Sequence, residues 1–330
     1  MKRILVNDQK MNGLSWYRVQ GVFTYLEKDM PDVKFGYSDE KFSWREMLHW
    51  DIMHFNRATG KPALEALSNI KALGKQVWLD WDDNIFEIDE HHQHSQYFNN
   101  DDNRKITIEI IKIADVITVT TNYLKSIIEP YNSNVIVIPN SYNDDIFPFR
   151  DMTNVTRDKI VLWRGSHFHR HDLFDFKDYL TPAIERNNKY TWAFMGDDPW
   201  FIRNEKTTKS IRYIPPKDAI GFYYDLYKAK PLVVHVPLKD STFNLAKSNI
   251  AMLEAILAGT VTISPNTEEW VHKGNVTYKN RQEYADKLEA FIYSSDAYIT
   301  KHYNQLVEEV KDKFLLSKNN ELRKEIIRNL

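Results

Sequence analysis

The chain has 330 residues, no cysteine and a formal net charge of -2. This length is sufficient for two domains that each bury a hydrophobic core. The lack of cysteine excludes disulfides, thiolate metal sites and a cysteine nucleophile, and the small net charge gives no global attraction to nucleic acid. No apolar run is long enough to span a bilayer and no secretion signal opens the chain, so we expect a soluble, cytoplasmic protein.

Short β-branched runs alternate with helical patterns along the first half of the chain. We expect strands at residues 2–6, 52–55, 76–79, 116–119 and 135–138, with helices at 62–73, 106–113 and 122–128. This alternation is typical of a parallel α/β sheet. The segment from Phe147 to Asp158 contains Pro148 and no clear period, so it is the expected domain boundary.

The alternation of strand and helix patterns begins again after the boundary. We expect strands at residues 160–163, 191–195, 232–236 and 261–263, an interrupted helix at 173–184, and helices from 282 onward. A further helix over 247–257, beginning near Ser248 and ending at Gly259, is also predicted. The second half therefore repeats the first in type, and ligands of such sheets bind outside the carboxyl ends of the strands.

The start of the helix at 247–257 carries the strongest local signal for chemistry. Lys247, Ser248 and Asn249 bring a cation, a hydroxyl and amide groups to a helix N-terminus, where the helix dipole favours a phosphate. Glu254 lies about two turns further along, where a carboxylate can hold ribose hydroxyls. The same residues are also compatible with an ordinary serine cap beside a surface lysine and glutamate.

This segment resembles the donor-binding helix of family 4 retaining glycosyltransferases of GT-B fold. The resemblance rests on Lys247-Ser248-Asn249, Leu253-Glu254-Ala255 and Gly259. Further segments agree in the same order along residues 4 to 275: Ala114 to Thr120, Val135 to Asn140 with Asp144 and Phe147, and Trp163-Arg164-Gly165-Ser166. Divergent members found in bacteriophage genomes are the most similar, which would place the protein in the host cytoplasm.

The resemblance implies both a fold and an activity. The expected fold is α/β of GT-B type, with two Rossmann-like parallel-sheet domains facing a central cleft. An acceptor domain would span 1–150, a donor domain 151–300, and helices at 301–330 would cross back to the first domain. The implied activity is transfer of a sugar from a UDP-sugar to an acceptor hydroxyl, retaining and without a metal or other cofactor. One departure is that the family's pair of glutamates keeps only Glu254, with Ala246 at the first position.

The expected donor site combines residues that follow strands of the second domain with the helix start. A guanidinium and a hydroxyl can meet a diphosphate, and cations can stabilise charge on the departing nucleotide. The expected donor-binding residues are Gly13, Arg164, Gly165, Ser166, His167, Arg170, Tyr213, Ile214, Lys247, Ser248, Asn249 and Glu254, of which Arg164 and Lys247 are also expected to be catalytic.

The first domain contains a carboxylate cluster directly after the strand at 76–79. Asp80, Asp82 and Asp83 can orient sugar hydroxyls or accept a proton, and we expect Asp82 and Asp83 to be catalytic. The Asp-x-Asp spacing also occurs in metal-dependent GT-A transferases, but the two-domain pattern argues against a metal here. The expected acceptor-binding residues are Asn12, Trp16, Tyr17, Arg18, Asp80, His91 and His92, although Trp16 and Tyr17 also suit a packing role.

The acceptor remains open at this level. A hydroxymethylated pyrimidine in DNA, a saccharide and a protein side chain are all compatible with the pattern, and basic residues near Phe42 and Trp44 suit DNA: Lys41, Arg45, Arg57 and Lys61. A nucleotide-sugar epimerase and a non-catalytic nucleotide-sugar-binding protein are the alternatives in function. The histidine clusters at 91–94 and 167–171 are expected to be exposed or to line the site rather than to bind zinc.

Overall fold

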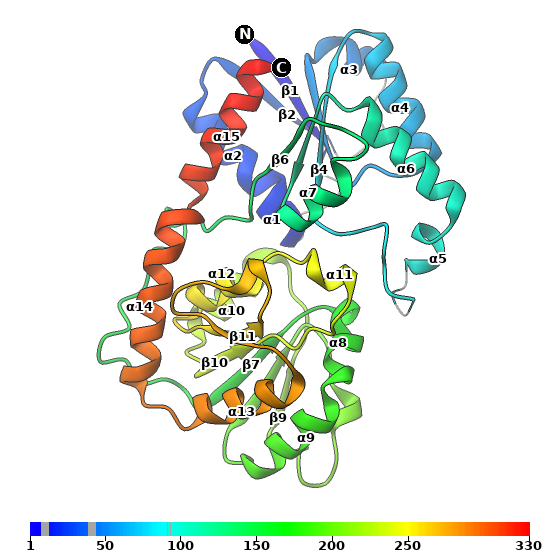
Figure 1. Cartoon of the computed structure of the whole chain (residues 1–330). Helices are drawn as coiled ribbons and strands as arrows, with labels where there is room; N and C mark the ends of the chain where they lie inside the picture. The colour runs from blue at the N-terminus through cyan, green and yellow to red at the C-terminus, as the bar shows by residue number, and fades with distance from the viewer. Residues whose placement is uncertain (8–12, 39–43, 91, 93) are drawn as a thin grey trace. The chain divides into compact units, whose positions relative to one another are not determined.

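The structure is a computed structural model that describes residues 1–7, 13–38, 44–90, 92 and 94–330 (Figure 1). It divides into two compact units. Unit 1 comprises Met1–Ser141, Leu245–Ser248 and Leu316–Leu330, and unit 2 comprises Tyr142–Asn244 and Asn249–Leu315. The sequence placed the boundary near residue 150. The units divide at residue 142 because the Tyr142 amide already donates to the Phe314 carbonyl of unit 2, at 2.7 Å.

The sheet of unit 1 is parallel throughout and, in the described residues, contains six strands. They are β1 (Lys2–Asn7), β2 (Val33–Ser38), β3 (Ile52–Asn56), β4 (Gln76–Trp81), β5 (Val116–Val119) and β6 (Val135–Val137), in the order β2-β1-β3-β4-β5-β6. The five strands expected from sequence are present, and β2 is an additional edge strand paired with β1, Lys2 opposite Val33. The order reverses between β1 and β3, and ligands of parallel sheets bind outside the carboxyl ends of the strands at such a point.

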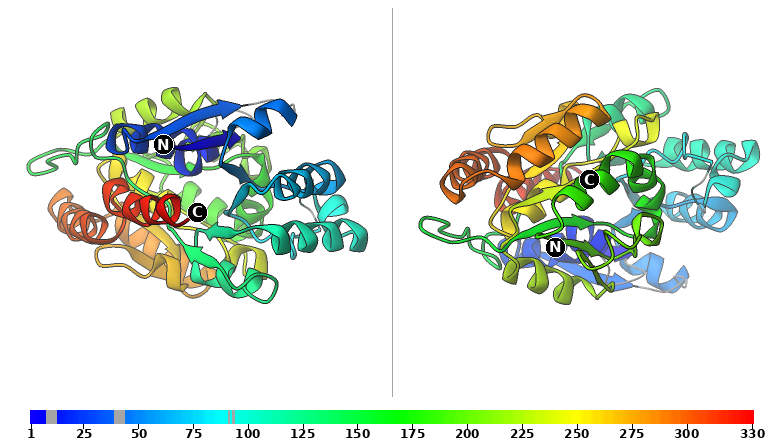
Figure 2. Two further views of the ribbon diagram at one scale, coloured as in Figure 1. Left: turned by 90° about the horizontal axis from the view of Figure 1, so that it is seen from above. Right: turned by 90° about the horizontal axis from the view of Figure 1, so that it is seen from below.

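Helices cover both faces of this sheet. They are α1 (Gly13–Arg18), α2 (Gln20–Asp29), α3 (Trp44–His49), α4 (Gly60–Ala72), α5 (Ser95–Phe98), α6 (Asp101–Ile113), α7 (Asn122–Ile128) and α15 (Leu316–Asn329). The last helix, α15, packs beside α2, whereas α4 and α6 pack together on the other side of the strands, as Figures 1 and 2 show. Ile4, Phe23, Trp78 and Ile327 meet in one buried core.

Unit 2 repeats this plan, again with six parallel strands in its described residues. They are β7 (Ile160–Arg164), β8 (Thr191–Met195), β9 (Ile211–Ile214), β10 (Val233–His235), β11 (Thr262–Pro265) and β12 (Val276–Tyr278), in the order β12-β11-β10-β7-β8-β9. The order reverses between β7 and β10. The predicted α/β class with two parallel sheets is therefore confirmed.

The helices of unit 2 again form two layers. They are α8 (Arg170–Asp175), α9 (Lys177–Arg186), α10 (Ala219–Lys228), α11 (Thr242–Leu245, whose last residue belongs to unit 1), α12 (Ile250–Leu257), α13 (Arg281–Ile292) and α14 (Asp296–Lys313). Short 3-10 helices η1, η2 and η3 span His167–His169, Trp200–Ile202 and Glu268–Trp270. α9 contacts α13, whereas α12 contacts α10 and α14. Among the described residues, no helix has both the length and the apolar character that crossing a membrane requires.

The packing of α15 gives a test of unit 1. Ile327 is fully buried against β1 and α2, so Ile327→Ala removes core volume and should cost about 2–5 kcal/mol of local stability. Native-state hydrogen exchange of β1 and β3 amides should show this loss, with β8 amides in unit 2 unaffected. Leu322→Ala on an exposed part of the same helix is the control and should cost less than about 1 kcal/mol. Equal exchange in both variants would contradict the packing.

Candidate functional site

The carboxyl end of β4 is organised around a buried ion pair. Asp80 accepts two hydrogen bonds from the Arg18 guanidinium, at 2.9 and 2.5 Å, and further ones from Thr118 at 2.6 Å and Asn56 at 2.9 Å. Burial on its own raises the pKa of the Asp80 carboxyl, but the charge and hydrogen bonds of Arg18 outweigh it, so the pKa falls to about 2. Asp80 and Arg18 are each only 2% exposed, so each neutralises the other inside the protein.

Asp82 and Asp83 follow this strand and hold two further cations. Arg57 contacts both carboxylates, donating through Nη2 to each at 2.6 Å, and Lys247 Nζ donates to Asp83 at 2.5 Å. The pKa of the Asp82 carboxyl is raised, first by burial and then by the repulsion of Asp83, and Arg57 offsets only part of this rise. Asp82 is therefore a stronger proton acceptor than an ordinary surface carboxylate.

Arg57 adopts an unusual backbone conformation in this cluster. Its φ is +52°, in the left-handed region that costs a non-glycine residue on the order of 1 kcal/mol. The Arg57 amide donates to the Asp80 carbonyl at 2.9 Å, while its side chain bridges Asp82 and Asp83. These contacts hold the strained turn and keep the guanidinium over the two carboxylates.

The segment Leu245–Ser248, which contains part of the expected donor motif, clusters with unit 1. Asn140, after β6, donates to the Ser248 hydroxyl at 2.8 Å, and Thr121, after β5, donates to the Ala246 carbonyl at 3.4 Å. Together with the bond from Lys247 to Asp83, the segment thus contacts groups that follow three neighbouring strands. Lys247 and Ser248 belong to unit 1, whereas Asn249, Glu254 and Arg164 belong to unit 2.

In unit 2, the expected donor residues Arg164 and Glu254 contact each other. Arg164 ends β7, and its Nε donates to the Glu254 carboxylate on α12, which is almost completely buried. The helix begins at Ile250 rather than near Ser248, because Asn249 takes the cap position with a non-helical ψ of +30°. Glu254 is consequently only about one turn beyond the helix start.

Asn249 at the start of α12 is linked to the body of unit 2 through a histidine. Its Nδ2 lies 3.5 Å from Nε2 of His272, and Nδ1 of His272 lies 3.3 Å from the Glu309 carboxylate on α14. Glu309 also accepts a bond from Lys313 at 2.6 Å. This chain of polar contacts restrains the end of α12 that faces the carboxyl edge of the sheet.

The loops after β7 and β8 pack so closely that two positions require glycine. Gly196 has a φ of +104°, and a Cβ there would lie 2.3 Å from the Gly165 carbonyl oxygen. A Cβ on Gly165 would lie 2.7 Å from the Trp163 ring. Glycine at 165 is therefore required by close packing against Trp163, next to Arg164.

Further expected donor residues lie on the same edge of this sheet. Ser166 precedes η1, which contains His167, and Arg170 begins α8 and forms a fork with Asp197, at 2.8 and 2.6 Å. Tyr213 and Ile214 end β9, where the Ile214 carbonyl accepts from Gly196 at 2.9 Å. The structure thus gathers the loops after β7, β8 and β9, although Arg170 is already engaged by a carboxylate.

The expected acceptor residues have mixed environments. Trp16 is half-buried and Tyr17 is buried, so Tyr17 takes the packing role that its sequence context also allowed. His92 lies beside His94 with ring centroids 5.5 Å apart. Gly13, which was expected at the donor site instead, opens α1 and is exposed. Asn12 and His91 lie outside the described residues.

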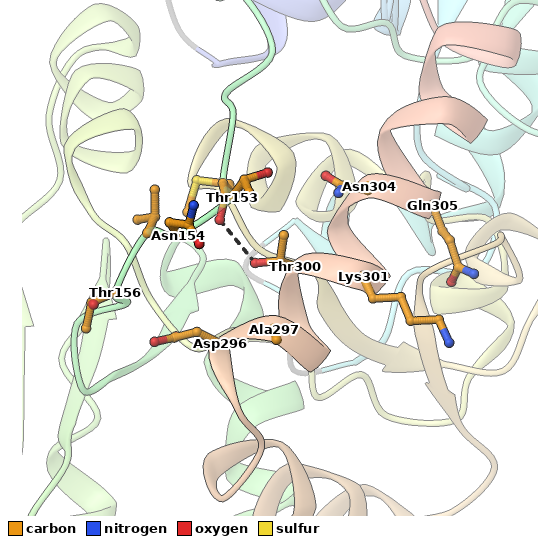
Figure 3. A pocket seen from close by; sticks show the side chains of 11 residues that line it. Thr153, Asn154, Thr156, Asp296, Ala297, Thr300, Lys301, Asn304 and Gln305 are labelled. Atoms are coloured by element: carbon orange, nitrogen blue, oxygen red, sulfur yellow. Dashed lines mark hydrogen bonds between the residues drawn. The ribbon is translucent and has the colours of Figure 1, made fainter.

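Neither a metal-ligand arrangement nor the pocket described next coincides with these residues in the described part of the chain. Within the described part of the chain, no group of three or more histidines or carboxylates is arranged to hold a metal ion. A pocket of about 810 Å³ lies instead between residues 152–156 and one face of α14, where the Thr300 hydroxyl donates to the Met152 carbonyl at 3.2 Å (Figure 3). Most of its lining side chains are exposed, and none of those described belongs to the expected site.

Several partners of the site were not expected from sequence. They are Asn56, Thr118, Thr121 and Asn140 in unit 1, and Asp197, His272 and Glu309 in unit 2. Asn140 ends the segment Val135 to Asn140, on which the family resemblance partly rests, and in the sequence Arg57 is one of four basic residues near Phe42 and Trp44. Their roles depend on side chains distant in sequence, which periodicity does not reveal.

Neither known protein families nor curated protein sequences yield a match to this chain. Solved structures do match. HepE (Alr3699) of Anabaena, in complex with UDP and glucose, has a TM-score of 0.68 at 12% identity, covering 100% of both chains. A glycosyltransferase from Rickettsia africae has a TM-score of 0.64 at 15% identity, covering 99% of this chain and 98% of that one. A UDP-forming trehalose-phosphate synthase from Burkholderia xenovorans has a TM-score of 0.66 at 11% identity, covering 100% and 99%. These matches confirm the predicted GT-B fold.

The Arg18–Asp80 pair predicts how unit 1 responds to acid. Because the folded pKa of Asp80 lies near 2 and its ordinary value is 3.8, the pair adds stability above about pH 4 that is lost as pH falls toward 2. Asp80→Asn should remove this acid dependence and cost about 3–5 kcal/mol at neutral pH, since it leaves Arg18 buried without its counter-charge. Hydrogen exchange of β4 amides from pH 5 down to about pH 2 measures both effects.

The matched control is Asp51→Asn, which breaks the partly exposed pair of Arg3 and Asp51 in the same unit. That change should cost no more than about 1 kcal/mol. An Asp80→Asn variant as stable as this control would show that the buried pair does not hold the edge of the sheet.

Proposed function

We propose that this protein is a glycosyltransferase that moves a sugar from a UDP-sugar to an acceptor hydroxyl. The proposal rests mainly on Arg164 and Glu254, which meet at the carboxyl edge of unit 2, beside the point where the strand order reverses. Ligands of parallel sheets bind at that point. HepE has been solved with UDP-glucose and the S. aureus protein TarM with UDP, and both share this fold.

The donor diphosphate is proposed to bind at the start of α12 and the loop after β7. The helix N-terminus and the Arg164 guanidinium attract anionic oxygens, and the Ser166 hydroxyl can donate to them. Glu254 holds Arg164 in place, and its second oxygen is suited to a ribose hydroxyl. Arg170 would contact the diphosphate if its guanidinium exchanged the Asp197 carboxylate for a phosphate. Lys247, which precedes Asn249 by two residues in the sequence, is proposed as a further cation for the diphosphate.

In the reaction, the bond between the anomeric carbon and the diphosphate oxygen breaks, and its electron pair stays on UDP. The acceptor oxygen forms the new bond to the anomeric carbon and loses its proton. Cations around the leaving diphosphate stabilise the charge that develops there. Asp82 is proposed as a proton acceptor, which its raised pKa supports.

Retention of the anomeric configuration and independence of metal ions are finer parts of the proposal. Retention is supported by the resemblance of Lys247-Ser248-Asn249 and Glu254 to family 4 enzymes. Metal independence is supported by the carboxylates after β4, since Asp82 and Asp83 are held by Arg57 and Lys247, which a divalent ion would have to displace.

For the acceptor, the sequence left DNA, saccharides and proteins open. The support for hydroxymethylpyrimidine DNA was a group of four basic residues, and Arg57 of that group is engaged by two carboxylates. DNA is therefore tested as one of several acceptors, and the proposal does not depend on it. An epimerase would instead convert the donor sugar without any acceptor.

The activity can be tested by mass spectrometry of products from a panel of UDP-sugars, with saccharides, peptides and hydroxymethylcytosine DNA as acceptors. Wild-type protein should transfer one sugar, and Arg164→Ala should lower the rate by about 10²–10³-fold because it removes charge from the leaving group. Arg186→Ala, which breaks an exposed pair with Glu289, is the matched control and should retain full activity. UDP binding without turnover would favour a binding protein, and epimerised donor alone would favour an epimerase.

Metal independence gives a separate prediction. Transfer should proceed unchanged after the protein is dialysed against EDTA, because cationic side chains and the helix N-terminus carry the charge stabilisation. Initial rates with EDTA, Mg²⁺ and Mn²⁺ measure this. A rate that falls with EDTA and returns with Mn²⁺ would contradict it.

A further inference from the structure

An exposed cluster of three aromatic side chains lies on unit 2, outside the proposed donor site. Trp200 and Phe201 belong to η2 and Phe174 belongs to α8. The ring of Phe201 lies 5.2 Å from that of Phe174 and 5.8 Å from that of Trp200, both edge to face. Trp200 is 63% exposed and Phe174 42% exposed, although burying such rings is strongly favourable.

The backbone beneath Trp200 is held by the protein itself. Asp197 forms a fork with Arg170, and Asp198 Oδ1 accepts two bonds from Arg203, at 3.1 and 2.9 Å. The Trp200 amide donates to the Asp198 carbonyl at 2.9 Å, and the neighbouring Ile202 is buried. The backbone that carries the indole is therefore held in place without any ligand, which lowers the entropy cost of binding.

These groups match the chemistry of a sugar ring. The C–H face of a pyranose packs against an aromatic face, while its equatorial hydroxyls need donors and acceptors at the rim. Asp198 and Arg203, both partly exposed, offer carboxylate and guanidinium groups beside Trp200. Lys177 Nζ already lies over Phe174, 4.2 Å from the ring centroid, so Trp200 provides the principal open face.

The charges around the cluster favour a neutral ligand over a polyanion. Arg170 pairs with Asp197 and Arg203 pairs with Asp198, so both arginines near Trp200 are matched by carboxylates, and Lys177 adds one cation beside Phe174. Nucleic-acid binding depends on lysine and arginine that neutralise phosphates, and stacking alone supplies only part of its affinity. This balance favours a saccharide over single-stranded DNA.

The cluster also lies close to the proposed donor site within unit 2. Its loop begins at Gly196, which packs directly against Gly165, next to Arg164. We propose that Trp200, Phe174 and Phe201, with Asp198 and Arg203 at the rim, form a binding site for a neutral saccharide chain. The binding site does not depend on the proposed glycosyltransferase function. Only the further step, that the bound saccharide is part of the acceptor, rests on that function.

The test uses full-length protein, an array of neutral oligosaccharides that includes maltotriose, laminaritriose and chitotriose, and octathymidylate. Wild type should bind at least one oligosaccharide. Trp200→Ala should weaken that affinity at least about tenfold, whereas Trp200→Phe should keep it within about threefold because a ring remains. Ile220→Ala, which removes an equally exposed apolar side chain from α10, is the control and should bind as wild type does.

Calorimetric titration with UDP separates this proposal from the proposed function. UDP affinity should be the same in wild type, Trp200→Ala and Ile220→Ala. The saccharide site is overturned if no oligosaccharide binds, if binding is the same in Trp200→Ala, or if only octathymidylate binds through Trp200. Saccharide binding without any UDP binding would leave the saccharide site standing and count against the glycosyltransferase.

Discussion

The buried pair of Arg18 and Asp80 is the interaction on which the carboxyl edge of the first sheet depends. Its hydrogen bonds join α1 to β4 and reach Thr118 on β5, Asn56 on β3 and the Ile138 carbonyl just after β6, at 2.6 Å. A charge placed there without its partner would be strongly unfavourable, so the pair forces these elements into one arrangement. Asp82 and Asp83 follow directly after β4, which this pair anchors, and they bind Arg57 and Lys247. Three carboxylates therefore contact three cations at one edge of the sheet.

Most of the fold could be predicted because buried parallel strands have a plain signature. Val116–Val119 and Thr191–Met195 appear as expected, since strands covered on both faces are nearly continuous apolar runs. The missed elements lack that signature. β2 is a partly exposed edge strand that contains Gly36, β12 has three residues, and α10 combines buried Tyr223 with exposed Ile220 and Tyr224, which blurs a helical period.

The site was predicted in its loops but not in its pairings. Residues that follow strands, such as Arg164 and Asp82, can be recognised from the strand pattern alone. Tertiary packing decides which charged side chains pair with each other, and the sequence pattern does not show this. The pairings that could not be predicted are Arg164 with Glu254, Arg170 with Asp197, and Lys247 with Asp83. The start of α12 was misplaced by two residues because Asn249, and not the serine before it, occupies the cap. The GT-B fold is shared with HepE at only 12% identity, which shows how few residues such a fold prescribes.

The return of α15 to unit 1 has a consequence for synthesis on the ribosome. Leu316, Ile326 and Ile327 belong to the same core as β1 and α2, yet they are made more than 280 residues after those elements. Domains usually fold in the order in which they emerge. Here residues 142–244 and 249–315 are all synthesised before the core of unit 1 can be completed, so unit 2 can fold first. Until α15 is made, the apolar face of unit 1 that α15 covers is open to chaperones.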